Sequence, residues 1–85
     1  MKSVAPYFTY ILECADGTLY TGIATDVEKR FEEHKNGKGA KYTRAHGAKR
    51  IRYSEHCADR GAALRREIEI KNMPRAEKLS LIGRA

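Results

Sequence analysis

Residues 8–23, FTYILECADGTLYTGI, decide the fold. Two runs rich in β-branched and aromatic residues flank Asp16-Gly17, a dipeptide typical of a tight turn between antiparallel strands. The stretch therefore predicts a β-hairpin. Because side chains alternate between the two faces of a strand, we expect Tyr10 and Tyr20 to lie near each other. Gly22 lacks a side chain at the end of the second strand, where another backbone or a ligand can approach closely.

The segment after the hairpin predicts a helix over residues 26–35. Thr25 and Glu28 fit a capping box with Thr25 as the N-cap, and Asn36-Gly37 ends the helix. One stripe of this helix is expected to face the core although two of its four members are polar: Val27, Arg30, Phe31 and His34.

Residues 36–48 are expected to form a long loop, or a loop with one short helix. Residues 49–55 alternate like a third strand, with Ile51 and Tyr53 pointing inward. These two segments follow one another without a Pro-rich or Ser-rich linker, so we expect them to belong to the same domain.

The C-terminal part of the chain predicts two further helices. Asp59 is the expected N-cap of a helix over residues 62–71, and Pro74 begins a last helix that we expect to close the sheet. In the longer helix, one stripe is expected to contain Leu64, Glu67, Ile68 and Lys71. The predicted fold is α+β, a three-stranded antiparallel β-sheet flanked by helices in the order β-β-α-β-α-α.

At 85 residues the chain is expected to form one domain, with its core over about residues 7–82. The composition, 41% hydrophobic and 33% charged, excludes a disordered chain and a membrane protein. No signal peptide is recognisable, and there are only two cysteines, Cys14 and Cys57. We therefore expect a cytoplasmic protein with free thiols and no membrane partner; a disulfide is the alternative that the sequence leaves open.

The net charge of +6 points to an acidic partner such as nucleic acid. Residues 35–52 contain seven basic side chains and no acidic one, whereas the other 10 Lys and Arg residues nearly balance the 11 acids. A solvated loop that favours solubility is the competing interpretation. The basic side chains of this segment are Lys35, Lys38, Lys41, Arg44, Lys49, Arg50 and Arg52.

Arg30 and Glu67 each fall on a helix stripe that is expected to face the core. A charged group there is costly unless it is paired or acts on a ligand. A salt bridge between Arg30 and Glu67 that ties the two helices together is the structural interpretation. The functional interpretation places both side chains in a site with Tyr10, Tyr20 and His34.

Four segments follow one another along the chain: TYI (9–11), YTGIATDVEKRFEEH (20–34), GKGAKYT (37–43) and ALRRE (63–67), followed by Lys71. In this order they resemble the GIY-YIG nuclease family, including its small single-domain bacterial members. The first triplet, TYI, lacks the glycine of the family motif, and the second, YTG, has threonine in place of isoleucine. The likeness covers about residues 7–82.

The resemblance implies a role for five residues. Tyr10 and Tyr20 are the paired motif tyrosines, Arg30 is the catalytic arginine and His34 is the active-site histidine. Glu67 is the implied ligand of Mg²⁺ or Mn²⁺, and one carboxylate suffices because Mg²⁺ keeps most of its waters and takes oxygens from the substrate phosphate. We expect Tyr20 to activate the attacking water, as the base or through His34, and Tyr10 to orient the water or a phosphate oxygen.

The implied activity is that of a Mg²⁺-dependent endonuclease that hydrolyses phosphodiesters in DNA, in repair or recombination. Residues 37–43 and 63–67 also resemble the nuclease subunit of a eukaryotic endonuclease that cuts branched DNA, so selection by structure rather than sequence is expected. The basic segment would hold the phosphate backbone. The alternative is a non-catalytic nucleic-acid-binding module of the same fold. DNA or RNA as substrate, association with the nucleoid, a recruiting protein partner and the oligomeric state stay open.

Overall fold

The computed structural model describes residues 6–83, whose elements form an α+β fold as predicted. Three strands form one antiparallel sheet in the order β2-β1-β3. The predicted order β-β-α-β-α-α lacked one short helix, α2, which occupies part of the expected loop. The elements are β1 (Tyr7–Cys14), β2 (Leu19–Ala24), α1 (Val27–Lys35), α2 (Lys41–His46), β3 (Ala48–Cys57), α3 (Arg60–Lys71) and α4 (Arg75–Gly83).

The predicted hairpin is confirmed, and its turn is held by Asp16. The Asp16 carboxylate accepts hydrogen bonds from the Thr18 backbone N–H at 3.1 Å and from the Thr18 hydroxyl at 2.7 Å. Gly17 has a φ of 85°, in the left-handed region that glycine adopts without strain. The resulting register places Tyr10 opposite Gly22 on the neighbouring strand.

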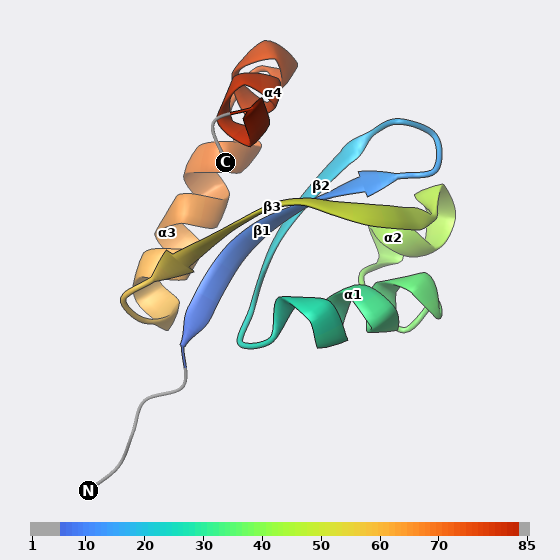
Figure 1. Cartoon of the computed structure of the whole chain (residues 1–85), viewed down its shortest axis with the longest axis horizontal. Coiled ribbons are helices and arrows are strands. Elements are labelled where there is room, and N and C mark those ends of the chain that lie inside the picture. Colours follow the sequence, from blue (N-terminus) through green and yellow to red (C-terminus); the bar gives the residue numbers. More distant parts are fainter. Residues whose placement is uncertain (1–5, 84–85) are drawn as a thin grey trace, which may run out of the picture.

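Helices cover both faces of the sheet (Figure 1). Neighbouring residues of the central strand contact different helices. The Thr9 hydroxyl donates to the Ala63 carbonyl of α3 at 3.0 Å, whereas the Tyr10 hydroxyl is hydrogen-bonded to His34 of α1. Side chains at consecutive strand positions point to opposite faces. This arrangement explains why Thr9, Tyr10, Ile11 and Leu12 are all buried.

Helix α1 begins one residue later than predicted. Its N-cap is Asp26 rather than Thr25, and the Asp26 carboxylate accepts a hydrogen bond from the Lys29 backbone N–H at 3.1 Å. Asp26 has the extended backbone of an N-cap residue, with φ −140° and ψ 100°. The helix ends at Asn36-Gly37 as predicted.

Helix α3 presents a different face to the sheet than its sequence pattern predicted. Its N-cap is Asp59, as expected, but its buried residues are Ala63 and Ile70. Ile68 is 59% exposed, so the prediction that it shares a core-facing stripe with Leu64 and Lys71 is wrong. The small Ala63 side chain lets the helix approach Thr9 closely, and this contact sets its rotation.

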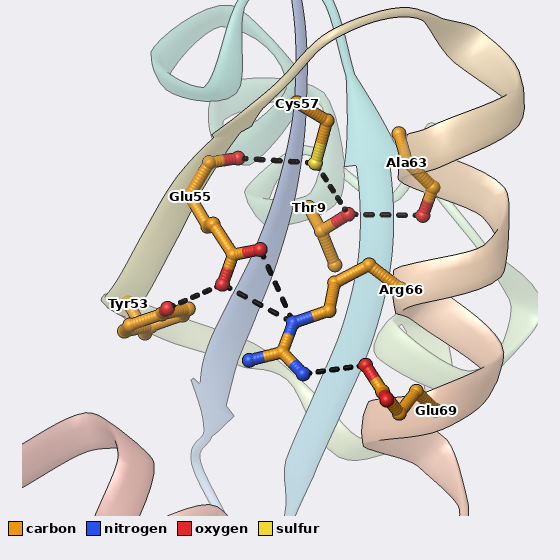
Figure 2. Close-up of polar contacts among 7 residues, drawn as sticks. All are labelled: Thr9, Tyr53, Glu55, Cys57, Ala63, Arg66 and Glu69. Atoms are coloured by element: carbon orange, nitrogen blue, oxygen red, sulfur yellow. Dashed lines mark hydrogen bonds and ion pairs between the residues drawn. The ribbon is translucent and has the colours of Figure 1, made fainter.

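A network centred on Arg66 ties α3 to β3 (Figure 2). The Arg66 Nε atom donates to both carboxylate oxygens of Glu55, at 3.2 and 3.1 Å, and Arg66 also pairs with Glu69 at 2.6 Å. The Tyr53 hydroxyl donates to Glu55 at 2.6 Å. Ile51 and Tyr53, which were predicted to point inward, are only half-buried, because β3 is an edge strand.

Helix α4 starts after Pro74 as predicted, but it does not close the sheet. It contains no buried residue, and Leu79 is 41% exposed. The helix continues from the end of α3 away from the strands (Figure 1). Within residues 6–83, no helix combines the length and the apolar character needed to cross a membrane.

Both cysteines are buried, free thiols, in agreement with the expectation. They lie near opposite ends of β1, because Cys14 pairs with Ala48 and Cys57 pairs with Tyr7. Strand residues rise about 3.3 Å each, so the two thiols are too far apart to form a disulfide.

The observed N-cap gives a stability prediction for α1. Asp26→Ala removes the side-chain acceptor for the Lys29 N–H and should lower the free energy of unfolding by about 1 kcal/mol. Thr25→Ala is the matched control, because Thr25 is exposed and does not cap the helix. Urea denaturation of both variants checks this; a larger loss in Thr25→Ala would contradict the observed cap.

Candidate active site

Tyr10 lies across the backbone of β2 at Gly22. A Cβ atom on Gly22 would lie 2.6 Å from the Tyr10 hydroxyl oxygen and 2.8 Å from the ring carbon that bears it. Tyr10 is only 1% exposed, so the surrounding residues leave its side chain no room to move away from Gly22. The glycine at this position is therefore required by the tyrosine on the neighbouring strand, whereas the sequence had predicted the approach of another backbone or a ligand.

Tyr20 lies beside Tyr10, with ring centroids 6.4 Å apart, which confirms the predicted proximity. It also belongs to an aromatic row contributed by α1 and α2. Its ring is 5.2 Å from His34, edge-to-face, and 6.0 Å from Tyr42, in a stacked arrangement. Tyr42 in turn stacks on His46 at 4.1 Å. These contacts restrict the orientation of the Tyr20 ring from one side.

His34 is buried, at 1% exposure, and both of its ring nitrogens have partners. Nε2 lies 2.9 Å from the Tyr10 hydroxyl, and Nδ1 lies 2.6 Å from the Thr43 hydroxyl. Burial lowers the pKa of His34, and the nearby Arg30 guanidinium lowers it further. The imidazole is therefore neutral at pH 7. Because Nε2 faces Tyr10, the geometry does not support the expected relay from Tyr20 through His34.

Arg30 pairs with Glu33 on its own helix, at 2.9 Å. The structural interpretation of an Arg30–Glu67 salt bridge is therefore wrong: Glu67 pairs with Lys71 at 3.3 Å. The Glu33 carboxylate raises the pKa of Arg30. Each ion pair joins residues three or four positions apart on one helix, where the side chains meet without spanning the gap between helices.

The charges of Arg30 and Glu67 converge on the two tyrosines. The pKa of Tyr10 is raised to about 12, mainly by burial and also by the nearby Tyr20 and Glu67, while Arg30 opposes the shift. Burial also raises the pKa of Tyr20, with Lys71 opposing and Glu67 adding to the shift. Both tyrosines are thus protonated at pH 7, and α1 and α3 both act electrostatically on the same pair.

Glu67 fits a divalent cation that is completed by other ligands. Its carboxylate side chain is 17% exposed, and its present partner is the flexible, 52% exposed Lys71 ammonium. No cluster of three or more His, Cys, Asp or Glu side chains suited to a metal occurs within residues 6–83. A single carboxylate suits Mg²⁺, which keeps several waters and takes phosphate oxygens.

A shallow groove of about 220 Å³ opens beside Arg30, between the end of β2 and α1. It is largely polar and leads from solvent to the guanidinium. Its lining residues are Ile23, Ala24, Thr25, Asp26, Lys29, Arg30 and Glu33.

The seven basic residues predicted to bind nucleic acid lie in different electrostatic surroundings. Arg50 and Arg52 both pair with Glu13 at 2.7 Å, and Lys35 lies 4.0 Å from Glu32. The sequence pattern had not revealed the Glu13 pairs, because Glu13 lies 37 and 39 residues away. Of these seven basic residues, four have no ion-pair partner among residues 6–83: Lys38, Lys41, Arg44 and Lys49.

Three further residues shape the site. Gly39 and Thr43 lie in the segment 37–43, for which only a role in holding the phosphate backbone was predicted, and no role was predicted for Glu33. Glu33 holds Arg30, and Thr43 is bonded to His34. Gly39 faces the His34 ring so closely that a Cβ atom there would overlap it. The sequence contained one usable signal, the i, i+3 spacing of Arg30 and Glu33.

The chain matches the family model described as the GIY-YIG catalytic domain over residues 6–80. It is 47% identical over 77 residues to a UPF0213 protein of Staphylococcus saprophyticus, with 91% of this chain and 94% of the relative covered. It is 46% identical over 79 residues to a UPF0213 protein of Natronomonas pharaonis, with 93% of each covered.

A similar solved structure is the solution NMR structure of the UPF0213 protein BH0048 from Bacillus halodurans. The TM-score is 0.58 at 42% sequence identity, and the match covers 92% of this chain and 83% of that chain. The family model spans most of the sequence, and the relatives are similar over nearly their whole length. The chain therefore belongs to the GIY-YIG family of nucleases.

Proposed function

We propose that this protein is a Mg²⁺- or Mn²⁺-dependent endonuclease that hydrolyses phosphodiester bonds in DNA. It selects its substrate by shape rather than by base sequence and serves DNA repair or recombination. The observation that supports this most is the Tyr10 hydroxyl, held by His34 beside Arg30. The electrostatic effect of Glu67 on both tyrosines adds a carboxylate to the same constellation.

Arg30 neutralises the charge that builds on the phosphoryl oxygens in the transition state. A guanidinium is always charged and offers several donors in a fixed plane, so it suits a phosphate better than lysine does. Glu33 holds Arg30 from one side and leaves the other donors available. The groove beside Arg30 lets a phosphate approach from solvent.

The proton of the attacking water passes to the Tyr10 oxygen as Tyr10 transfers its own proton to Nε2 of His34. This route needs a neutral His34, which the lowered pKa provides, and it avoids an isolated tyrosinate, which the pKa of about 12 for Tyr10 disfavours. Tyr20 orients the water or a phosphate oxygen. Glu67 would hold the Mg²⁺, which when bound supplies positive charge to the phosphate and lowers the pKa of coordinated water.

The DNA backbone is held by the four basic residues of segment 35–52 that have no ion-pair partner within residues 6–83: Lys38, Lys41, Arg44 and Lys49. Lys41 and Arg44 lie on α2, the helix that also carries Tyr42 and Thr43 into the site. Contacts of lysine and arginine with phosphates do not depend on base sequence. Substrate choice then depends on the shape of the nucleic acid, and a branch or an end is the substrate class we propose.

The first prediction of this proposal concerns turnover. Glu67→Gln and Arg30→Ala should each reduce metal-dependent cleavage of labelled flap and four-way-junction DNA by about 100-fold or more, and EDTA should abolish cleavage. Glu69→Gln and Glu28→Ala are controls on the same two helices, at exposed positions that do not line the groove beside Arg30, and should cleave normally. DNA binding without cutting, unchanged in Glu67→Gln, would replace the nuclease by a non-catalytic binding module.

The second prediction separates the basic residues by their ion pairs. Arg44→Gln should weaken duplex binding and reduce the slope of log K against log salt by about 0.9. Arg50→Gln should change affinity less, because Arg50 already pairs with Glu13. Fluorescence anisotropy across a salt series measures both slopes. An equal or larger effect of Arg50→Gln would place the DNA along β3 instead of α2.

The third prediction tests the neutral His34 that the proton transfer requires. Burial lowers the pKa of His34, so below about pH 6.5 the unfolded chain binds more protons than the folded chain. The free energy of unfolding should therefore fall as the pH is lowered from 7.5 to 5.5. Denaturant titrations should show a smaller fall in His34→Gln; equal falls in both proteins would mean that His34 is not held neutral.

A further inference from the structure

His34 on α1 stands in the middle of a buried chain of hydrogen bonds that runs from Tyr10 on β1 to Thr43 on α2. Tyr10 contacts Nε2 at 2.9 Å, and Thr43 contacts Nδ1 at 2.6 Å. A neutral imidazole carries its proton on one nitrogen only, so one contact must be donated by the ring and the other accepted by it. The partner at the α2 end decides which.

At the α2 end, the Thr43 hydroxyl already has an acceptor. Its oxygen lies 2.9 Å from the Ala40 carbonyl, to which it donates. A hydroxyl has a single proton, so toward His34 the Thr43 oxygen can only accept. The proton between the two side chains therefore belongs to Nδ1 of His34.

At the other end, the contact between the Tyr10 hydroxyl and Nε2 of His34 follows from the count made at the α2 end. With the proton of the neutral ring on Nδ1, Nε2 has none, so Nε2 can only accept and the Tyr10 hydroxyl donates to it. The charge of Arg30 acts on Tyr10 and lowers its pKa, and a guanidinium has no acceptor that could compete with Nε2 for the Tyr10 proton.

The loop before α2 brings its backbone against Nδ1. Gly39 allows this, since a side chain there would overlap the imidazole. The Ala40 backbone N–H points at Nδ1 from 3.4 Å and by itself would favour an Nδ1 without a proton. The Thr43 oxygen lies much closer to Nδ1, at 2.6 Å, so we take the Thr43 contact to dominate the choice of tautomer.

We propose that Thr43 is a positioning residue that keeps His34 in the Nδ1–H tautomer, so that Nε2 stays available to accept the proton of Tyr10. Its use in catalysis rests on the proposed nuclease function. As Tyr10 gives its proton to Nε2, the Nδ1–H bond to Thr43 stabilises the imidazolium that forms. Thr43 touches neither water nor phosphate in this scheme and acts through His34 alone.

The test compares Thr43→Val, which keeps the shape of the side chain but loses the hydroxyl, with Thr43→Ser, which keeps the hydroxyl. Long-range ¹H–¹⁵N correlation spectra of the ¹⁵N-labelled full chain at pH 7.5 report which nitrogen of His34 carries the proton. His46→Gln and His56→Gln assign the remaining imidazole signals. The spectra require neither metal nor DNA.

The wild type and Thr43→Ser should show the Nδ1–H tautomer, and Thr43→Val should shift His34 toward the Nε2–H tautomer. In cleavage assays Thr43→Val should lose kcat by at least about 10-fold with little change in KM, and Thr43→Ser should retain most of the wild-type kcat. An Nε2–H tautomer in the wild type, or an unchanged Nδ1–H tautomer in Thr43→Val, would overturn the assignment. The expected tautomers without cleavage by the wild type would instead overturn the nuclease proposal.

Discussion

The hydrogen bond between Tyr10 and His34 is the interaction on which the rest of the structure depends. It joins the central strand to α1, and both side chains are 1% exposed. A buried hydroxyl or imidazole without a partner costs about 1–3 kcal/mol, so this contact stabilises the fold as well as the site. Gly22, Gly39 and Thr43 are each explained by the space or the bonding that this one pair needs.

Arg30 and Glu67 each form an ion pair with a neighbour on the same helix, and they do not pair with each other. Arg30 pairs with Glu33 and Glu67 with Lys71, and both pairs are partly exposed. Partly exposed pairs contribute little to stability, since water competes for both charges. Their main effect is to restrict the positions of Arg30 and Glu67, whose side chains stay partly exposed.

The sequence predicted the features that depend on local patterns. Alternation and the Asp16-Gly17 turn predicted the hairpin, and the convergence of Tyr10 with Tyr20 followed from strand geometry alone. The predicted core-facing side of α3 was wrong, because the rotation of this helix depends on the contact of Ala63 with Thr9, 54 residues away. Thr25 and Asp26 are both residue types that cap helices well, and which of them is the N-cap of α1 depends on where the chain leaves β2. The roles of Arg30, His34 and Glu67 came from family resemblance and stay predictions.

The two glycines that face the Tyr10–His34 pair have a consequence for how this protein can evolve. They lie on different elements, Gly22 on β2 and Gly39 in the loop before α2, yet a methyl group at Gly22 would press on Tyr10 and one at Gly39 on the ring of its partner His34. Neither has a positive φ, so their backbone alone would tolerate alanine. Selection should therefore remove substitutions of either glycine. A substitution at one position cannot be compensated at the other, because the two new side chains would crowd opposite sides of the Tyr10–His34 pair.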